Sequence, residues 1–272
     1  MQTPSAANAA SPPHHSAAMN RVPKVTVDFW LIKLLAVTMG ETAADFLAVN
    51  LGLGLANTTI LMSAVLCGAI LLQFAQKKYV PWIYWLAVVL VSIVGTLMTD
   101  TLVDIFGVPL MTTTVTLTIA LMATFAAWYA SERTLSIHSI FTDRRERFYW
   151  LAILLTFALG TGAGDLVAEH FALGYLATGL LFGLIIAVFA FGHFVLKING
   201  VLCFWLAYIF TRPLGASFGD LLAQPVEYGG LGLGTIITSF LFLAAIVGTV
   251  IYASVTHRGE EFAAQDYTPG TL

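Results

Sequence analysis

The sequence predicts an all-α polytopic membrane protein with eight transmembrane helices, built as four tandem two-helix repeats in parallel orientation with both termini cytoplasmic. Composition is the first reason: 58% of the 272 residues are hydrophobic, 10% are charged, and the mean hydropathy is +0.87, whereas soluble domains are about 25% charged. The second reason is a set of long charge-free stretches, and the third is a fourfold sequence repeat. The net charge of −3 argues against a nucleic-acid binder, and two isolated cysteines against a zinc or disulfide framework.

Charge-free stretches locate the helices, because a helix that crosses a bilayer needs about 20 apolar residues. Residues 46–76, 79–99, 105–131, 148–164, 171–196 and 228–257 contain no Asp, Glu, Lys or Arg. Gly and Pro residues near 51–54, 106–109, 173–174 and 229–234 divide the longer stretches. We therefore expect helices over 25–49, 55–76, 80–104, 109–131, 147–170, 174–197, 200–224 and 233–256.

The distribution of Lys and Arg predicts the orientation. Basic residues flank every second connection, whereas the alternate loops at 50–54, 105–108, 171–173 and 225–232 contain none. The positive-inside rule then places both termini in the cytoplasm. The expected organisation is a disordered cytoplasmic tail (1–24), a membrane half with repeats 1 and 2 (25–131), a basic cytoplasmic loop (132–146), a second membrane half with repeats 3 and 4 (147–256) and a cytoplasmic tail (257–272).

Four segments share a Trp, a Gly ten residues later and an Asp five residues after that. They are Trp30-Gly40-Asp45, Trp85-Gly95-Asp100, Trp150-Gly160-Asp165 and Trp205-Gly215-Asp220. Each Gly and the residue before each Asp form a small-xxx-small pair, which lets helix backbones approach closely. We expect the odd-numbered helices to pack through these faces and to carry their Asp residues into a shared interior. The Trp residues are expected to act as interface anchors and in packing.

The four Trp residues and Gly-to-Asp segments carry a resemblance to a known family. Over about residues 25–256, the sequence resembles the bacterial multi-pass membrane proteins built from tandem two-helix repeats, each with a characteristic tryptophan. That family is of unknown function. The resemblance implies the repeat fold and a location in the bacterial inner membrane, and it implies no substrate.

Acidic residues on the odd-numbered helices form the candidate site. Each Asp lies 15 residues after its Trp, roughly 22 Å along a helix, and so in the outer half of the membrane. We expect the cation- or proton-binding residues to be Glu41, Asp45, Asp100, Asp165, Asp220 and Arg212, with weaker candidates Asp104, Glu169, His170, Thr96 and Thr161. Arg212 is expected to pair with the acids, and Lys33 to reach the cytoplasmic surface.

Clustered carboxylates in a low-dielectric site favour protons or a bound cation. Hard divalent ions prefer oxygen ligands, so a metal site would use Glu41, Asp45, Asp100, Asp165 and Asp220. The first hypothesis is a secondary transporter that exchanges a cation, such as manganese or magnesium, for protons; a ring of Asp would also suit a cation pore. The alternative is a non-transporting sensor or assembly module in which the acids are structural. No enzymatic motif or cofactor site is found, and the expected partners are the lipid bilayer and a small cation.

Overall fold

The computed structural model describes residues 20–266, and side chains as far as residue 256. This part of the chain contains eight long helices and no strand. The helices are α1 (Val27–Asp45), α2 (Leu55–Phe74), α3 (Pro81–Asp100), α4 (Leu110–Glu132), α5 (Asp143–Asp165), α6 (Tyr175–Phe194), α7 (Gly200–Ala223) and α8 (Thr235–Asp266). Their number and order agree with the prediction.

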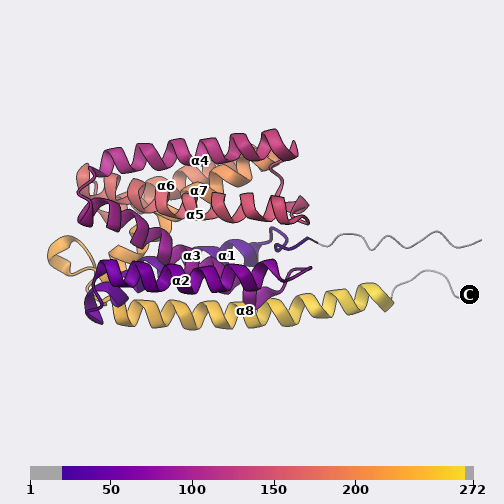
Figure 1. Ribbon diagram of the computed structural model, residues 1–272, viewed down its shortest axis with the longest axis horizontal. Coiled ribbons are helices and arrows are strands. Elements are labelled where there is room, and N and C mark those ends of the chain that lie inside the picture. Colours follow the sequence, from indigo (N-terminus) through magenta and orange to yellow (C-terminus); the bar gives the residue numbers. More distant parts are fainter. Residues whose placement is uncertain (1–19, 267–272) are drawn as a thin grey trace, which may run out of the picture.

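The odd-numbered helices form a closed inner ring. α1 packs against α3, α3 against α5, α5 against α7, and α7 against α1. Each outer helix packs on the inner helix that follows it: α2 on α3, α4 on α5 and α6 on α7, while α8 returns to cover α1. The helices run along one common long axis, and the described chain starts and finishes at the same end (Figure 1). The four repeats are therefore related around a single axis.

Close helix contacts in the ring are made at the repeat glycines. The glycine of each inner helix faces a side chain of the next inner helix, in the pairs Gly40–Ser92, Gly95–Phe157, Gly160–Arg212 and Gly215–Val37. A Cβ added to Gly95 would lie 2.7 Å from the Phe157 Cβ, closer than atoms of this kind pack. The predicted packing of the odd-numbered helices through their small-residue faces is thus confirmed, and it follows the same rule at all four contacts.

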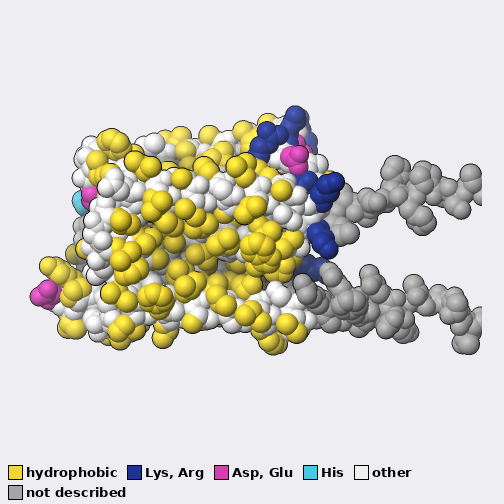
Figure 2. All heavy atoms as spheres, turned by 60° about the horizontal axis from the view of Figure 1, so that its bottom comes forward, with side chains coloured by type: hydrophobic (Ala, Val, Ile, Leu, Met, Phe, Trp, Pro, Cys, Tyr) yellow, Lys and Arg dark blue, Asp and Glu magenta, His cyan; other side chains and the backbone are white. Residues whose placement is uncertain are grey.

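The exterior is strongly apolar. Seven of the described helices are long and apolar enough to cross a membrane, and Figure 2 shows hydrophobic side chains covering the middle of the molecule, with Lys and Arg gathered at one end. α1 is the exception because it carries Asp28, Lys33, Glu41 and Asp45. Since α3, α7 and α8 surround it, its charges are largely enclosed by protein.

The repeat Trp residues act mainly in packing. Trp85, Trp150 and Trp205 are buried, while Trp30 is partly exposed. The Trp205 Nε1–H donates to the Leu135 carbonyl at 2.8 Å. Together with neighbouring tyrosines they fill the ring at the end where the odd-numbered helices begin.

Both predicted tails need correction within the described residues. Residues 20–24 pack on the bundle: Val22 is buried, and the Arg21 guanidinium lies 2.6 Å from Asp143 and 2.7 Å from Glu146. The reason is that Glu146 is fully buried and needs a cationic partner. At the other end, α8 continues to Asp266 instead of stopping at 256. Residues 1–19 and 267–272 of the predicted tails lie outside the described residues.

Candidate cation site

A change of helix type occurs at the repeat Asp in three of the four repeats. After Asp45, Asp100 and Asp165, the α-helix passes into a five-residue π-helical turn: η1 (Phe46–Asn50), η2 (Thr101–Ile105) and η4 (Leu166–His170). In the fourth repeat α7 stays α-helical to Ala223, and Gln224 is extended because Pro225 follows. Such π turns are rare and occur frequently at functional sites.

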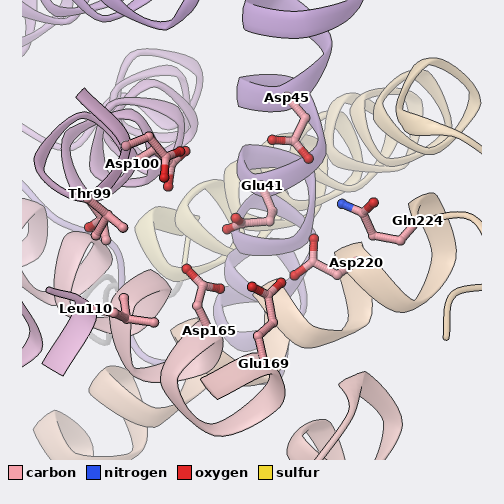
Figure 3. A pocket seen from close by; sticks show the side chains of 11 residues that line it. Glu41, Asp45, Thr99, Asp100, Leu110, Asp165, Glu169, Asp220 and Gln224 are labelled. Carbon is pink, nitrogen blue, oxygen red and sulfur yellow. The ribbon is translucent and has the colours of Figure 1, made fainter. Parts of the chain in front are cut away.

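The repeat Asp residues line one cavity of about 230 Å³ at the ends of the inner helices. Its walls are Glu41, Asp45, Thr99, Asp100, Val103, Asp104, Leu110, Asp165, Glu169, Asp220 and Gln224. Figure 3 shows the labelled carboxylates turned toward a common space from all four inner helices. The structure therefore brings together five of the six main candidates and two of the weaker ones.

The carboxylates differ in depth. Glu41 and Asp220 are the most buried, at 6% and 8% exposure. Asp45, Asp100 and Asp165 are half-buried, and Asp104 and Glu169 lie exposed at the rim. Glu169 accepts a hydrogen bond from the Tyr175 hydroxyl at 3.1 Å. The cavity thus becomes more enclosed from Glu169 toward Glu41.

The repeat Asp side chains do not act as helix caps. Asp45, Asp100 and Asp165 make no capping hydrogen bond at the turns they precede. Among the described residues, none donates a hydrogen bond to the Asp220 carboxylate, although this side chain is more than nine-tenths buried. Its oxygens face the cavity, where water, a proton or a cation can be the partner. The interpretation of these acids as turn-stabilising residues therefore has no supporting contact.

Arg212 lies beneath the cavity at the centre of the ring, with no exposed surface. Its guanidinium donates to the carbonyls of Val37 (3.1 Å) and Phe157 (3.3 Å) and to the Glu41 carboxylate (2.8 Å). The predicted pairing of Arg212 with the acidic cluster is thus present, with Glu41 as the acid. Arg212 does not line the cavity itself.

Thr96 and Thr161 complete the layer around Arg212. Both are fully buried; Nη2 of Arg212 donates to Thr161 Oγ1 at 2.8 Å and also to Thr96 Oγ1. The Thr96 hydroxyl donates to Glu41 Oε2 at 3.2 Å. Through these bonds the guanidinium is held by all three other inner helices. The threonines support the floor of the cavity and do not face its interior.

A comparison with protein-family models identifies the family of this chain. The family model described as Repeat of Unknown Function (DUF347) matches residues 29–79, 83–134, 148–199 and 203–258. The chain belongs to the DUF347 repeat family. Searches of curated proteins and of solved structures gave no match. The expected resemblance to a tandem-repeat family of unknown function is confirmed, and each DUF347 segment starts within two residues of a repeat Trp.

Comparing equivalent positions in the four DUF347 repeats shows where the symmetry is broken. Arg212, seven residues after its Trp, corresponds to Val37, Ser92 and Phe157. Four positions later, Glu41 corresponds to Thr96, Thr161 and Ala216. One repeat thus supplies the only arginine of the inner layer within the described part, and another supplies its acid. The Asp is common to all four repeats, whereas the ion pair beneath it is not.

Lys33 is a buried residue that the sequence interpretation placed wrongly at the surface. It has no exposed surface, its Nζ donates to the Tyr208 carbonyl at 3.1 Å, and it lies 3.8 Å from the centre of the Tyr208 ring. Local sequence favours the surface because Lys33 is one turn from Trp30, and Trp residues favour the membrane interface. The ring of helices instead encloses this face of α1. Lys33 forms a second buried layer below Arg212.

One further candidate, His170, has no direct part in the cavity, and the five acids proposed as metal ligands do not form a tight ligand set. His170 is exposed, packs against Phe171, and does not line the cavity. Within the described residues, no three His, Cys, Asp or Glu side chains are close enough to coordinate one metal ion together. A cation in this cavity would therefore keep part of its water shell, as magnesium usually does in proteins.

Proposed function

We propose that this DUF347 protein is an integral membrane secondary transporter for a cation, with a divalent metal such as manganese or magnesium exchanged for protons. In this proposal both termini are cytoplasmic and the protein resides in the bacterial inner membrane. The cavity is the external binding site. The observation that carries the proposal is the composition of its wall: seven of the eleven lining residues are acidic and none is Lys, Arg or His.

Membrane insertion is supported by the surface. Large hydrophobic side chains on the outer helices are widely exposed, for example Ile60 on α2 (70%), Ile119 on α4 (63%), Leu184 on α6 (64%) and Ile237 on α8 (61%). Water would solvate such a surface poorly. The concentration of Lys and Arg at one end (Figure 2) matches the positive-inside rule. The acid-lined cavity then opens toward the opposite side of the membrane.

Electrostatics favours a cation in this cavity. Seven carboxylates around about 230 Å³ produce a strongly negative potential, which low-dielectric walls concentrate. Oxygen ligands from carboxylates suit hard cations better than soft ones. Protons compete for the same carboxylates, so binding of a proton and binding of the cation would exclude each other. Competition of this kind is what coupled exchange requires.

The closed floor favours a transporter over an open pore. Below Glu41 the path meets Arg212 and then Lys33, both fully buried. The permanently charged guanidinium of Arg212 repels a cation that leaves the cavity inward. Passage therefore requires the inner helices to rearrange, as in alternating access.

A non-transporting cation sensor is the second candidate. The fully bonded Arg212 layer favours it, because the guanidinium joins all four inner helices and resists their separation. Such a protein would bind the cation in the same cavity without moving it. Binding and flux must therefore be measured separately.

Proteoliposomes test the proposal. Purified protein is reconstituted with a metal-quenched dye and a pH dye inside, and manganese is added outside. We expect manganese entry with proton efflux for the wild type, and at least a tenfold loss for Asp165→Asn and for Asp220→Asn. Glu227→Gln is the matched control, since Glu227 is an exposed acid beside α7 that does not line the cavity.

Thermal unfolding with magnesium, calcium, manganese, zinc and nickel supplies the binding measurement, because a ligand specific to the folded state stabilises it. Thermal stabilisation by a metal ion without metal flux in proteoliposomes would favour the sensor over the transporter. Wild-type flux in both folded cavity variants would refute the assigned site.

A further inference from the structure

A second cleft, of about 390 Å³, lies at the basic end of the molecule between α4 and α5. It is lined by Ser131, Arg144, Arg147, Phe148 and Leu151. It is separate from the acidic cavity, with which it shares no lining residue. Two guanidinium groups, one hydroxyl and two apolar side chains together suit a ligand with an anionic head and an apolar tail.

Positive charge at this corner is not fully neutralised. Arg145 forms an ion pair with the Glu132 carboxylate at 2.8 Å. Arg144 lies farther from the same carboxylate, at 3.9 Å, and 66% of its side chain is exposed. The other two nearby acids, Asp143 and Glu146, form ion pairs with Arg21. The Arg147 Nε donates to the Asp143 carbonyl at 3.2 Å, and among the described residues no carboxylate pairs with it. The cleft therefore keeps donors for an anion.

The apolar wall continues from the cleft onto the hydrophobic exterior. Leu151 is one turn beyond Arg147 on α5 and is 46% exposed. Phe148 is supported from behind by the buried Trp128, whose ring is parallel to it at 6.3 Å between centres. An acyl chain can thus run along α5 while its phosphate lies between the two arginines. Arg forms paired hydrogen bonds to phosphate oxygens readily.

We infer that this cleft is a binding site for the phosphate headgroup of an anionic phospholipid in the membrane leaflet at the basic end. The cytoplasmic leaflet, to which the basic end is assigned, carries the anionic lipid that attracts Lys and Arg. The inference rests on the membrane placement in the proposed function but not on transport. Lipid binding and cation flux can fail independently.

Native mass spectrometry of protein in neutral detergent tests the site, with phosphatidylglycerol, phosphatidylcholine or inorganic phosphate added. We expect one tightly retained phosphatidylglycerol for the wild type, and at least tenfold weaker retention for R144Q/R147Q. K77Q/K78Q removes the same charge from two exposed lysines at the same end outside the cleft, and it is expected to retain the lipid. Leu151→Glu, which keeps both arginines, is expected to weaken retention too.

Three results would overturn the inference. The first is equal retention by R144Q/R147Q and the wild type, and the second is equal loss in K77Q/K78Q, which would indicate a general charge effect. The third is equal retention of phosphatidylcholine or of inorganic phosphate, which would remove the anionic lipid as the ligand.

Discussion

Arg212 combines two roles beneath the cavity, because its charge is fully hydrogen-bonded and its side chain fills the contact between two inner helices. A fully buried guanidinium is costly to desolvate, and it is tolerated here because the Glu41 carboxylate and four oxygens from the surrounding helices accept its hydrogen bonds. The same residue packs its stem against Gly160, where a larger residue would collide with it. Charge and packing at this position are therefore linked.

The Arg212–Glu41 pair makes a prediction for stability. Removal of either partner alone, by Arg212→Met or Glu41→Leu, leaves an uncompensated buried charge and should cost about 3–5 kcal/mol of unfolding free energy. The double variant should lose clearly less than the sum, with a coupling of about 1–3 kcal/mol. Titration with a denaturing detergent measures these values. The Arg21–Asp143 pair, whose acid is 74% exposed, is the control and should couple by less than about 1 kcal/mol; additive losses for Arg212 and Glu41 would contradict the prediction.

At the scale of the helix, the repeat motif has two separate physical roles. The Gly sets the distance between neighbouring inner helices, and the Asp, five residues later, marks the point where three of the helices change to π geometry. A π turn widens the helix and changes the direction in which later side chains point. In the π turn after Asp165, Glu169 lines the rim of the cavity and the adjacent His170 does not.

The packing role of the Gly can be tested with a matched substitution. Gly95→Ala places a methyl group 2.7 Å from the Phe157 Cβ and should cost about 1–3 kcal/mol of unfolding free energy through overpacking. Gly68→Ala is the control, because Gly68 lies inside α2 with nothing within 4 Å of an added Cβ. It should be neutral or should stabilise by about 0.5–1 kcal/mol, as Ala favours a helix over Gly. Equal effects of the two substitutions on the detergent midpoint would show that the close approach at Gly95 does not matter.

For the whole molecule, the Trp-Gly-Asp spacing was enough to predict four parallel repeats and an inner ring of odd-numbered helices. The same spacing led to the acidic wall, since equivalent residues of a closed ring must face one axis. The burial of Lys33 was not predictable from local sequence, because it depends on α5 and α7 closing the ring over this face of α1. The π turns were also missed, since the residues after Asp45, Asp100 and Asp165 share no distinguishing pattern.

The orientation of the whole bundle decides on which side the acidic cavity opens. Lys and Arg lie at the end where the described chain starts and finishes (Figures 1 and 2), so insertion should leave that end in the cytoplasm. A reporter fused after Gly107, in the loop between α3 and α4, should therefore be active as a secreted phosphatase and dark as a green fluorescent protein. Fusion after Lys78, between α2 and α3, should give the opposite result. If the two fusions are reversed, the cavity opens to the cytoplasm, and the proposed transporter would take its cation from inside the cell.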